Sequence, residues 1–381
     1  MKSSRVSNDI HVNDKQEIPE MESIAYASQW KLMWIKFKRH KVAVFAGGFI
    51  LLLYFLAIFA GFFSPNDPNR RFSNYALGPP TRVRFFDSEG QFHWRPFVYG
   101  TERRLDSETF LRTHVEVPGE RYHLRLFVRA DEHRVLGLFA TNIRLIGTEE
   151  PGRFFPLGTD RQGRCMLSQM IYGSRISLSI GIIGVSLAFA IGIILGGISG
   201  YFGGAIDMFI QRMIEILMSF PTLPLWMALS AALPVTWSVL QVYFAISVIL
   251  SLLGWTGMAR VVRGKFLALR EEDYVTAAVI AGASPKRIMF RHMLPGFLSH
   301  IIASASLSIP GMILGETALS FLGLGLRRPA VSWGVLLQQA QNLNAVVLAP
   351  WLLASVFPII VTVLAFNFFG DGVRDAADPY S

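Results

Sequence analysis

The segment from Tyr274 to Pro295 contains the residues whose types and spacing are most informative about function. It follows an acidic stretch at residues 271–273, which suits a helix N-terminus, and Gly282 can adopt the backbone angles that end a helix. Ser284 suits the N-cap of a second helix, and Pro285 suits its first position. The spacing therefore predicts two short helices joined at Gly282.

We call these two helices and their junction, residues 274–295, the elbow. The chemistry that the elbow could perform is recognition of another protein. On the second helix, Ile288, Met289 and His292 are expected to lie on one side. The cationic side chains of Lys286, Arg287 and Arg291 are expected elsewhere on the same helix. A rigid helical knob of this kind could dock in a partner's groove, whereas the plainer alternative is a basic loop that only fixes membrane topology.

Motifs for catalysis or cofactor binding are absent from the sequence. There is no Gly-x4-Gly-Lys-Ser/Thr loop for phosphates and no His-Glu-x-x-His pair for zinc. Cys165 is the single cysteine, so neither a paired-cysteine metal site nor an intrachain disulfide can form. We therefore expect no metal, no cofactor and no enzymatic activity on this chain.

The composition indicates a membrane protein. Of the 381 residues 52% are hydrophobic and only 17% are charged, and the mean hydropathy is +0.40. The net charge of +9 could suggest nucleic acid, but the basic residues cluster beside apolar segments, which makes them a topology signal. The first cluster lies directly before the first apolar run and consists of Lys31, Lys36, Lys38, Arg39 and Lys41.

Six apolar runs are expected to cross the bilayer as helices. They are residues 42–63, 176–200, 213–232, 239–258, 297–314 and 351–369. The third is interrupted by Pro221, Pro224 and Pro234, and it carries Arg212 and Glu215, which could pair because they are three residues apart. The predicted fold class is an all-α polytopic membrane protein with a β-rich insertion between the first and second spans.

The basic clusters predict the topology and the domains. The tail and amphipathic segment 1–41 are expected in the cytoplasm, and so are the loop 259–295 and the C-terminal tail 371–381. The spans 42–63 and 156–370 enclose a periplasmic insertion, 64–155. Alternation of apolar and polar residues over 122–129, with similar patterns at 92–94 and 142–146, predicts strands there. Residues 1–22 resemble a disordered polar tail.

The elbow sequence resembles a known family. Ala277-Ala278, then Gly282, then Leu294-Pro295 is similar to the loop by which bacterial ABC-importer permeases dock on their nucleotide-binding subunit. The departures are Thr276, where that family usually has glutamate, and His292, where it usually has isoleucine. The fuller run is similar to the oligopeptide, dipeptide and nickel permeases. The residues that the resemblance places in the coupling loop are Tyr274, Thr276, Ala277, Ala278, Gly282, Ala283, Ser284, Arg291, His292, Leu294 and Pro295.

Two further stretches extend the resemblance over about residues 157–380. Residues 157–165 and 171–178 resemble the segment before the second span of those permeases, and residues 369–379 resemble the end of their C-type subunit. Cys165 stands where the family usually has aspartate, and Gln169 where it often has arginine. The insertion 64–155 is larger than in typical members.

The resemblance implies a type I ABC-importer permease in a bacterial inner membrane. Its implied partners are a homologous second permease, two ABC ATPase subunits that carry ATP and Mg, an extracytoplasmic solute-binding protein and the lipid bilayer, with no nucleic acid. Peptides are the implied cargo, and nickel, opines or other small solutes remain open. The alternatives from other classes are a secondary transporter or channel and a membrane receptor.

A second set of candidate residues lies near the predicted outer ends of the spans. Gly158, Thr159, Asp160, Gly163 and Arg164 could form a docking or translocation surface, or only a turn in which the aspartate caps a helix. Glu316 could meet a substrate's ammonium group or remain solvated. The small residues at 303–306 and Ser308 are more typical of a helix-packing surface.

Overall fold

The computed structural model describes residues 29–105, 107, 112–135 and 139–377. The polar tail expected over residues 1–22 lies outside the described residues, and so do residues 378–381. The helices in chain order are α2 (Gln29–Arg39), α3 (Lys41–Ile58), α4 (Ala60–Phe63), α5 (Met166–Phe202), α6 (Gly204–Ser219), α7 (Thr222–Ala231), α8 (Val239–Leu269), α9 (Asp273–Ile280), α10 (Pro285–Arg287), α11 (Leu298–Phe321), α12 (Trp333–Gln338), α13 (Leu343–Leu348) and α14 (Val356–Ala377).

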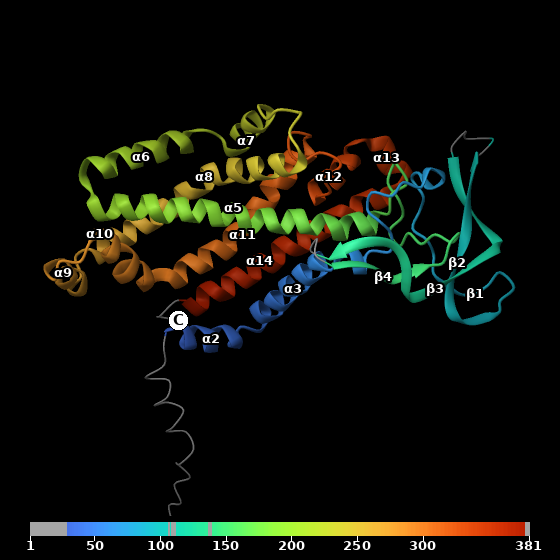
Figure 1. The fold of residues 1–381 in the computed structure, drawn as a ribbon, viewed down its shortest axis with the longest axis horizontal. Helices are drawn as coiled ribbons and strands as arrows, with labels where there is room; N and C mark the ends of the chain where they lie inside the picture. Colours follow the sequence, from blue (N-terminus) through green and yellow to red (C-terminus); the bar gives the residue numbers. More distant parts are fainter. Residues whose placement is uncertain (1–28, 106, 108–111, 136–138, 378–381) are drawn as a thin grey trace, which may run out of the picture.

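Long apolar helices run side by side along the molecule (Figure 1). Within the described residues, five helical segments are long and apolar enough to cross a membrane, or up to six if one bent pair counts as a span. They contain α3, α5, α8, α11 and α14. The predicted membrane class and the mostly helical fold are thus confirmed, and the described residues contain five or six candidate spans, against the six predicted.

The predicted third span, residues 213–232, is wrong as a single helix. The structure has two helices there, α6 and α7, which meet at 87°. Pro221 has no N–H to donate and forces Phe220 out of the helical region, to φ −87° and ψ 137°. The pairing of Arg212 with Glu215 is confirmed at 2.7 Å, between side chains that are both well exposed.

Helix α5 lies against α8 through a row of glycines. A Cβ atom built on Gly192, Gly196 or Gly200 would come within 2.4–2.8 Å of backbone carbonyl oxygens of α8. These glycines recur every four residues and therefore share one face, which lets the two backbones approach closely. The contact fixes α8, and α8 leads directly into the predicted elbow.

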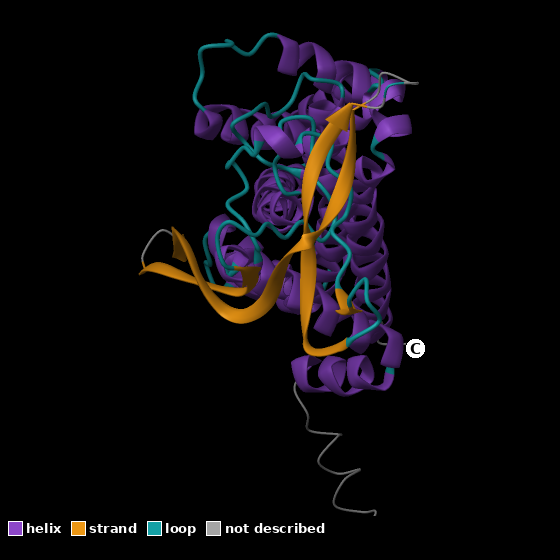
Figure 2. Ribbon diagram, turned by 90° about the vertical axis from the view of Figure 1, so that its right-hand side faces the viewer, coloured by secondary structure: helices purple, strands orange, loops and turns teal. Residues whose placement is uncertain are grey.

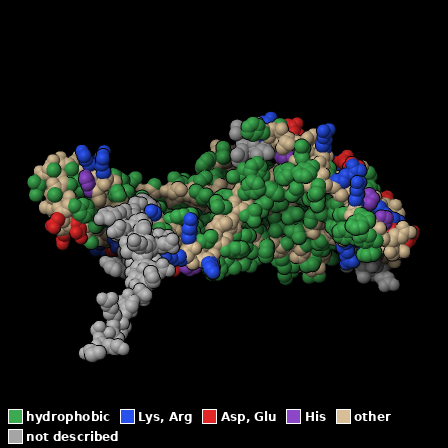
Figure 3. All heavy atoms as spheres, turned by 90° about the horizontal axis from the view of Figure 1, so that it is seen from below, with side chains coloured by type: hydrophobic (Ala, Val, Ile, Leu, Met, Phe, Trp, Pro, Cys, Tyr) green, Lys and Arg blue, Asp and Glu red, His purple; other side chains and the backbone are tan. Residues whose placement is uncertain are grey.

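The charged and apolar surfaces are segregated along the long axis. Figure 3 shows hydrophobic side chains covering the middle of the helical body and charged side chains gathered toward its ends. Helices α9, α10 and α2 and the end of α14 lie toward one end, and the sheet lies at the other (Figure 1). This arrangement suits a protein that spans a bilayer with a polar domain on each side.

The insertion forms one antiparallel sheet of four strands in the order β1-β2-β3-β4. Its strands are β1 (Arg84–Phe86), β2 (Phe92–Leu105), β3 (Arg112–Val135) and β4 (Phe139–Thr148). Strand β3 pairs with β2 along its first part and with β4 along its second, so two hairpins diverge across the end of the bundle (Figure 2). The strands predicted at 92–94, 122–129 and 142–146 are confirmed.

Asp87 organises the turn between β1 and β2. Its carboxylate accepts hydrogen bonds from the backbone N–H groups of Glu89 and Gln91 and from the side chains of His93 and Arg121, at 2.9–3.0 Å. The His93 bond, followed by the Gln91 bond, holds the pKa of Asp87 at about 2. The charged carboxylate is thus the form that this turn stabilises.

The turn is expected to loosen in acid. Because the folded pKa lies below the unfolded value of 3.8, the stabilisation is fully present above that pH and is lost as pH falls through about 2. Hydrogen-exchange protection of the Gln91 amide, normalised for intrinsic exchange, should fall in the full chain between about pH 4 and pH 2. The Asp87→Asn variant should show no such fall, and constant protection in the unaltered chain would contradict the assignment.

Candidate functional site

The elbow predicted at Gly282 is present as a helix end with a left-handed glycine. Gly282 has φ +75°, and its N–H donates to the Val279 carbonyl at 2.9 Å. The next N–H, of Ala283, donates to the Ala278 carbonyl at 3.0 Å. These two bonds form a Schellman motif, which ends α9 and sets the direction of the chain that follows.

The second half of the elbow differs from the single short helix predicted. Ser284 does occupy the N-cap and Pro285 the first helical position, but the Ser284 side chain makes no capping hydrogen bond. After α10 the chain continues through a π-helical turn, Ile288–Met293, and a 3₁₀ turn, Leu294–Phe297, into α11. Pro295 lacks the N–H that a regular helix requires there, which explains the change of helical type.

One face of the elbow is anchored in the core of the bundle. Val275, Ile288, Met289 and Met293 are at most 4% exposed and belong to the cluster that includes Phe266 of α8. Ile288 and Met289 thus share one side, as predicted, and that side is buried, whereas His292 is only half-buried. The buried face fixes the elbow to α5 and α8.

The opposite face of the elbow exposes large apolar side chains. Ile280 is 82% exposed, Val279 53%, Phe290 48% and Tyr274 45%. The predicted coupling residues Thr276, Ala277, Gly282, Ser284, Arg291 and Pro295 are exposed, and Ala278, Ala283, His292 and Leu294 are half-buried. An apolar knob with a basic fringe at one end of the bundle is suited to insertion in a protein groove.

An ion pair between Asp207 and Arg263 joins α6 to α8. The sequence did not predict it. Arg263 donates from Nε and Nη2 to the two carboxylate oxygens of Asp207, at 2.6 and 2.5 Å, and Ser199 donates to the same carboxylate at 2.5 Å. Such a two-pronged arrangement is the strongest geometry for an arginine and a carboxylate. Asp207 and Arg263 are 56 positions apart, so no local pattern connects them.

Asp160 is the centre of a buried network at the opposite end of the bundle. Its carboxylate accepts from Arg164 Nε at 2.9 Å, from Arg328 Nη2 at 3.2 Å and from two backbone N–H groups of its own turn. Gln169 accepts from the same Arg328 nitrogen at 2.9 Å. Burial, followed by the nearby Arg164 charge, lowers the pKa of Arg328 to about 10, so Arg328 remains charged at neutral pH.

The other residues of this outer loop hold separate segments together. Thr159 accepts from the Gly78 N–H and donates to the Tyr75 carbonyl, and its own carbonyl accepts from Trp351 Nε1 at 2.9 Å. Gly158 and Gly163 have positive φ, and a Cβ on Gly163 would meet Phe72 backbone atoms. The interpretation of Asp160 as a helix cap is wrong, because the N-cap of α5 is Cys165.

Burial distinguishes between the two interpretations of the outer residues. Thr159 and Asp160 are fully buried and Arg164 is 4% exposed, so a partner could not touch these side chains without rearrangement. Cys165 is fully buried as well. We therefore interpret this loop as a structural joint.

Glu316 is fully buried, so the expectation that it could remain solvated is wrong. Its carboxylate accepts from the hydroxyls of Ser332 at 2.7 Å, Ser320 at 2.8 Å and Ser177 at 3.4 Å. The three serines come from α5, α11 and the start of α12, so the carboxylate ties three elements together. Hydroxyl donors offset part of the cost of burying this group.

Comparison with known proteins identifies the family. The family described as the binding-protein-dependent transport system inner membrane component matches residues 192–380, and the N-terminal transmembrane domain of oligopeptide transport permease C matches residues 28–80. The oligopeptide transport system permease protein OppC of Haemophilus influenzae is 42% identical over 235 residues, which cover 61% of this chain and 72% of that protein. The chain belongs to the binding-protein-dependent transport permeases.

Further relatives place the permease within its family. The glutathione transport system permease protein GsiD of Pectobacterium atrosepticum is 30% identical over 365 residues, 95% of each chain. A solved structure of the MetNI methionine ABC transporter, in inward-facing conformations, is similar with a TM-score of 0.43 and 20% identity, over 55% of the permease and 97% of that chain. In sequence the permease is similar to the C-type permeases named for oligopeptide and dipeptide transport, as the resemblance predicted.

Proposed function

We propose that the permease forms one half of a peptide-conducting path and that separate ATPase subunits drive it through the elbow at Gly282. The single observation that carries this proposal is the shape of the elbow. One face, with Val275 and Ile288, is buried in the bundle, and the other exposes Val279 and Ile280 at the bundle's end. Such an element can transmit displacement from a docked protein to the spans.

The proposal includes the membrane topology and the partners. The elbow, α2 and the end of α14 lie toward the same end of the bundle and are placed in the cytoplasm, and the sheet is placed in the periplasm. A homologous second permease completes the path, two ABC ATPases bind ATP and Mg, and a solute-binding protein delivers the cargo. Peptides are favoured as cargo because relatives are named for oligopeptide and dipeptide transport.

Alternating access would follow from movement of the elbow. When the ATPases close around bound ATP, the two elbows move together and the spans shift between two arrangements, each open to one side. The ion pair between Asp207 and Arg263 would transmit this movement from α8 to α6. The break between α6 and α7 gives the path a segment that can change direction without unfolding a helix.

ATP-driven uptake by the complete transporter tests the proposal. Vesicles containing the permease, its partner permease, both ATPases and the binding protein should accumulate a labelled dipeptide or tripeptide only with ATP and Mg present. A variant ATPase that binds but does not hydrolyse ATP is the matched control and should abolish accumulation. If the vesicles accumulate Ni²⁺ and no peptide, the cargo is nickel and the peptide assignment is wrong. If uptake follows a solute gradient without ATP, the proposed coupling to ATP is refuted.

A further inference from the structure

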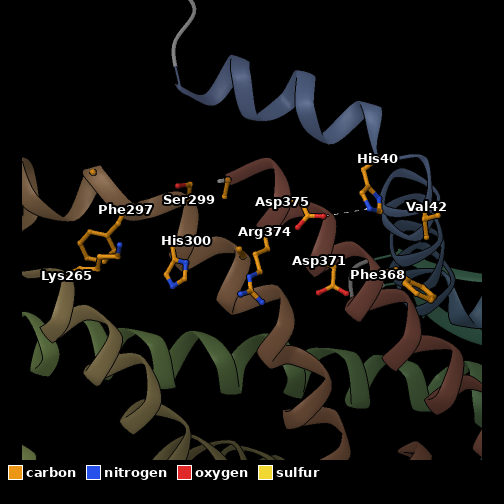
Figure 4. A pocket seen from close by; sticks show the side chains of 13 residues that line it. His40, Val42, Lys265, Phe297, Ser299, His300, Phe368, Asp371, Arg374 and Asp375 are labelled. Carbon is orange, nitrogen blue, oxygen red and sulfur yellow. Dashed lines mark ion pairs between the residues drawn. The ribbon is translucent and has the colours of Figure 1, made fainter. Parts of the chain in front are cut away.

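A cavity of about 960 Å³ opens beside the elbow, where α3, α8, α11 and α14 come together. Its polar lining is divided by charge. Figure 4 shows Lys265, His300 and Arg374 toward one side and Asp371, Asp375 and His40 toward the other. The coupling site and the outer network involve none of these side chains.

The formal charges of the cavity cancel when the histidines are neutral. Two cationic side chains, Lys265 and Arg374, are balanced by Asp371 and Asp375. Asp375 lies 4.0 Å from His40 Nε2, so it is already directed toward the end of the cavity formed by α3. Among the described residues, Lys265, Arg374 and Asp371 have no ion-pair partner. The charges of Lys265, Arg374 and Asp371 are thus available to a ligand that carries both signs.

An exposed apolar stripe begins at this cavity and runs along α14. Phe368 lines the cavity and is 48% exposed, and Leu364, Ile360 and Phe357 continue on the same helix face at 48%, 52% and 69%. From Phe357 to Phe368 the helical rise gives the stripe a length of about 16 Å. Half of a bilayer's hydrocarbon core is about 15 Å thick. The stripe therefore matches the depth of one leaflet.

We propose that the cavity binds the headgroup of a zwitterionic phospholipid of the phosphatidylethanolamine type. The phosphate lies between Lys265 and Arg374, whose guanidinium can hold two phosphate oxygens, and the ammonium lies at Asp371. An acyl chain follows the stripe from Phe368 toward Phe357. Basic pockets between membrane helices are known to bind lipid headgroups, and the two carboxylates here favour a zwitterionic headgroup over an anionic one.

The lipid would lie between the elbow and the C-terminal helix. Gly296 and Phe297, which also line the cavity, directly follow the elbow residue Pro295. A headgroup held there would fill the space between α11 and the end of α14 next to the element proposed to move. The lipid site itself does not depend on the transport proposal, since a bilayer surrounds the permease whatever its cargo is.

Lipid retention by the intact chain tests this site. The full-length permease is reconstituted in vesicles with equal fractions of phosphatidylethanolamine, phosphatidylcholine and phosphatidylglycerol, then extracted in mild detergent, and the retained lipids are measured by native mass spectrometry. Phosphatidylethanolamine should be enriched over the other two. The Lys265→Gln, Arg374→Gln double variant should retain roughly tenfold less, because it loses two charge-assisted contacts to phosphate.

Two single variants make the test specific. Asp371→Asn should remove the preference for phosphatidylethanolamine over phosphatidylglycerol while keeping phosphate binding. Because Asp371 is exposed, we expect this variant to fold normally. Arg212→Gln, an exposed residue outside the cavity, should change nothing. Equal retention of the three lipids by the unaltered chain overturns the proposal. An unchanged preference in Asp371→Asn, or unchanged retention in a folded double variant, overturns it as well.

Discussion

Replacing Gly282 with valine is expected to reduce ATP-driven uptake at least tenfold while leaving the helical bundle folded. Gly282 has φ +75°, a region that costs other residues about 1–2 kcal/mol and is least accessible to β-branched ones. To relieve that cost, the chain would give up the bonds from Gly282 and Ala283 that end α9. A loss of about 1.4 kcal/mol in docking corresponds to tenfold weaker binding of the ATPase.

The controls for this prediction separate backbone conformation from bulk. No atom lies within 4 Å of a Cβ built on Gly282, so a side chain fits there without a clash. Gly282→Asn should therefore retain most uptake, because asparagine tolerates the left-handed conformation. Gly264→Ala, at a similarly open glycine within α8, should be near neutral. Uptake and copurification of the ATPase are measured for each variant, and full activity of Gly282→Val would contradict the coupling role.

Local features of this elbow were predictable from the sequence because they depend on neighbouring residues. A glycine after a short helical run and a serine-proline pair specify where one helix ends and the next begins. The missing capping bond of Ser284 has no signal in the sequence. Pro295 does mark a break in the helical hydrogen bonding, but its position alone does not tell which helical types replace the regular helix.

Interactions between distant segments could not be read from one sequence. The partner of Asp207 is 56 residues away, and Arg328 reaches Asp160 across 168 positions. Prolines correctly marked the break in the third span, but their positions alone do not give the 87° angle between α6 and α7. The burial of Glu316 could not be predicted, because two of the hydroxyls that donate to it, those of Ser177 and Ser332, lie 139 and 16 positions away, and only Ser320 is on the same helix.

Removing the Asp160 carboxylate is expected to destabilise the outer end of the permease more than any surface change. Asp160 is fully buried and bonds to Arg164 and Arg328. In Asp160→Ala these cations would stay in a low-dielectric site without their counterion. Breaking a buried pair in this way typically costs about 3–5 kcal/mol. The apparent melting temperature of the full chain in detergent should fall accordingly, whereas Glu150→Gln, at an exposed ion pair, should leave it nearly unchanged.

A double-mutant cycle distinguishes loss of the ion pair from loss of the turn. Asp160→Asn keeps an oxygen for the backbone N–H groups of Gln162 and Arg164 but removes the charge. Adding Arg328→Gln removes one uncompensated cation, so the double variant should melt higher than Asp160→Asn alone. If the decreases in melting temperature caused by Asp160→Asn and Arg328→Gln simply add, Asp160 does not stabilise the permease by balancing charge. Its two hydrogen bonds from backbone N–H groups then account for its contribution to stability. If the double variant is rescued, this joint is held by balanced charge across α5 and the loop after α11, far from the elbow that is proposed to take up force.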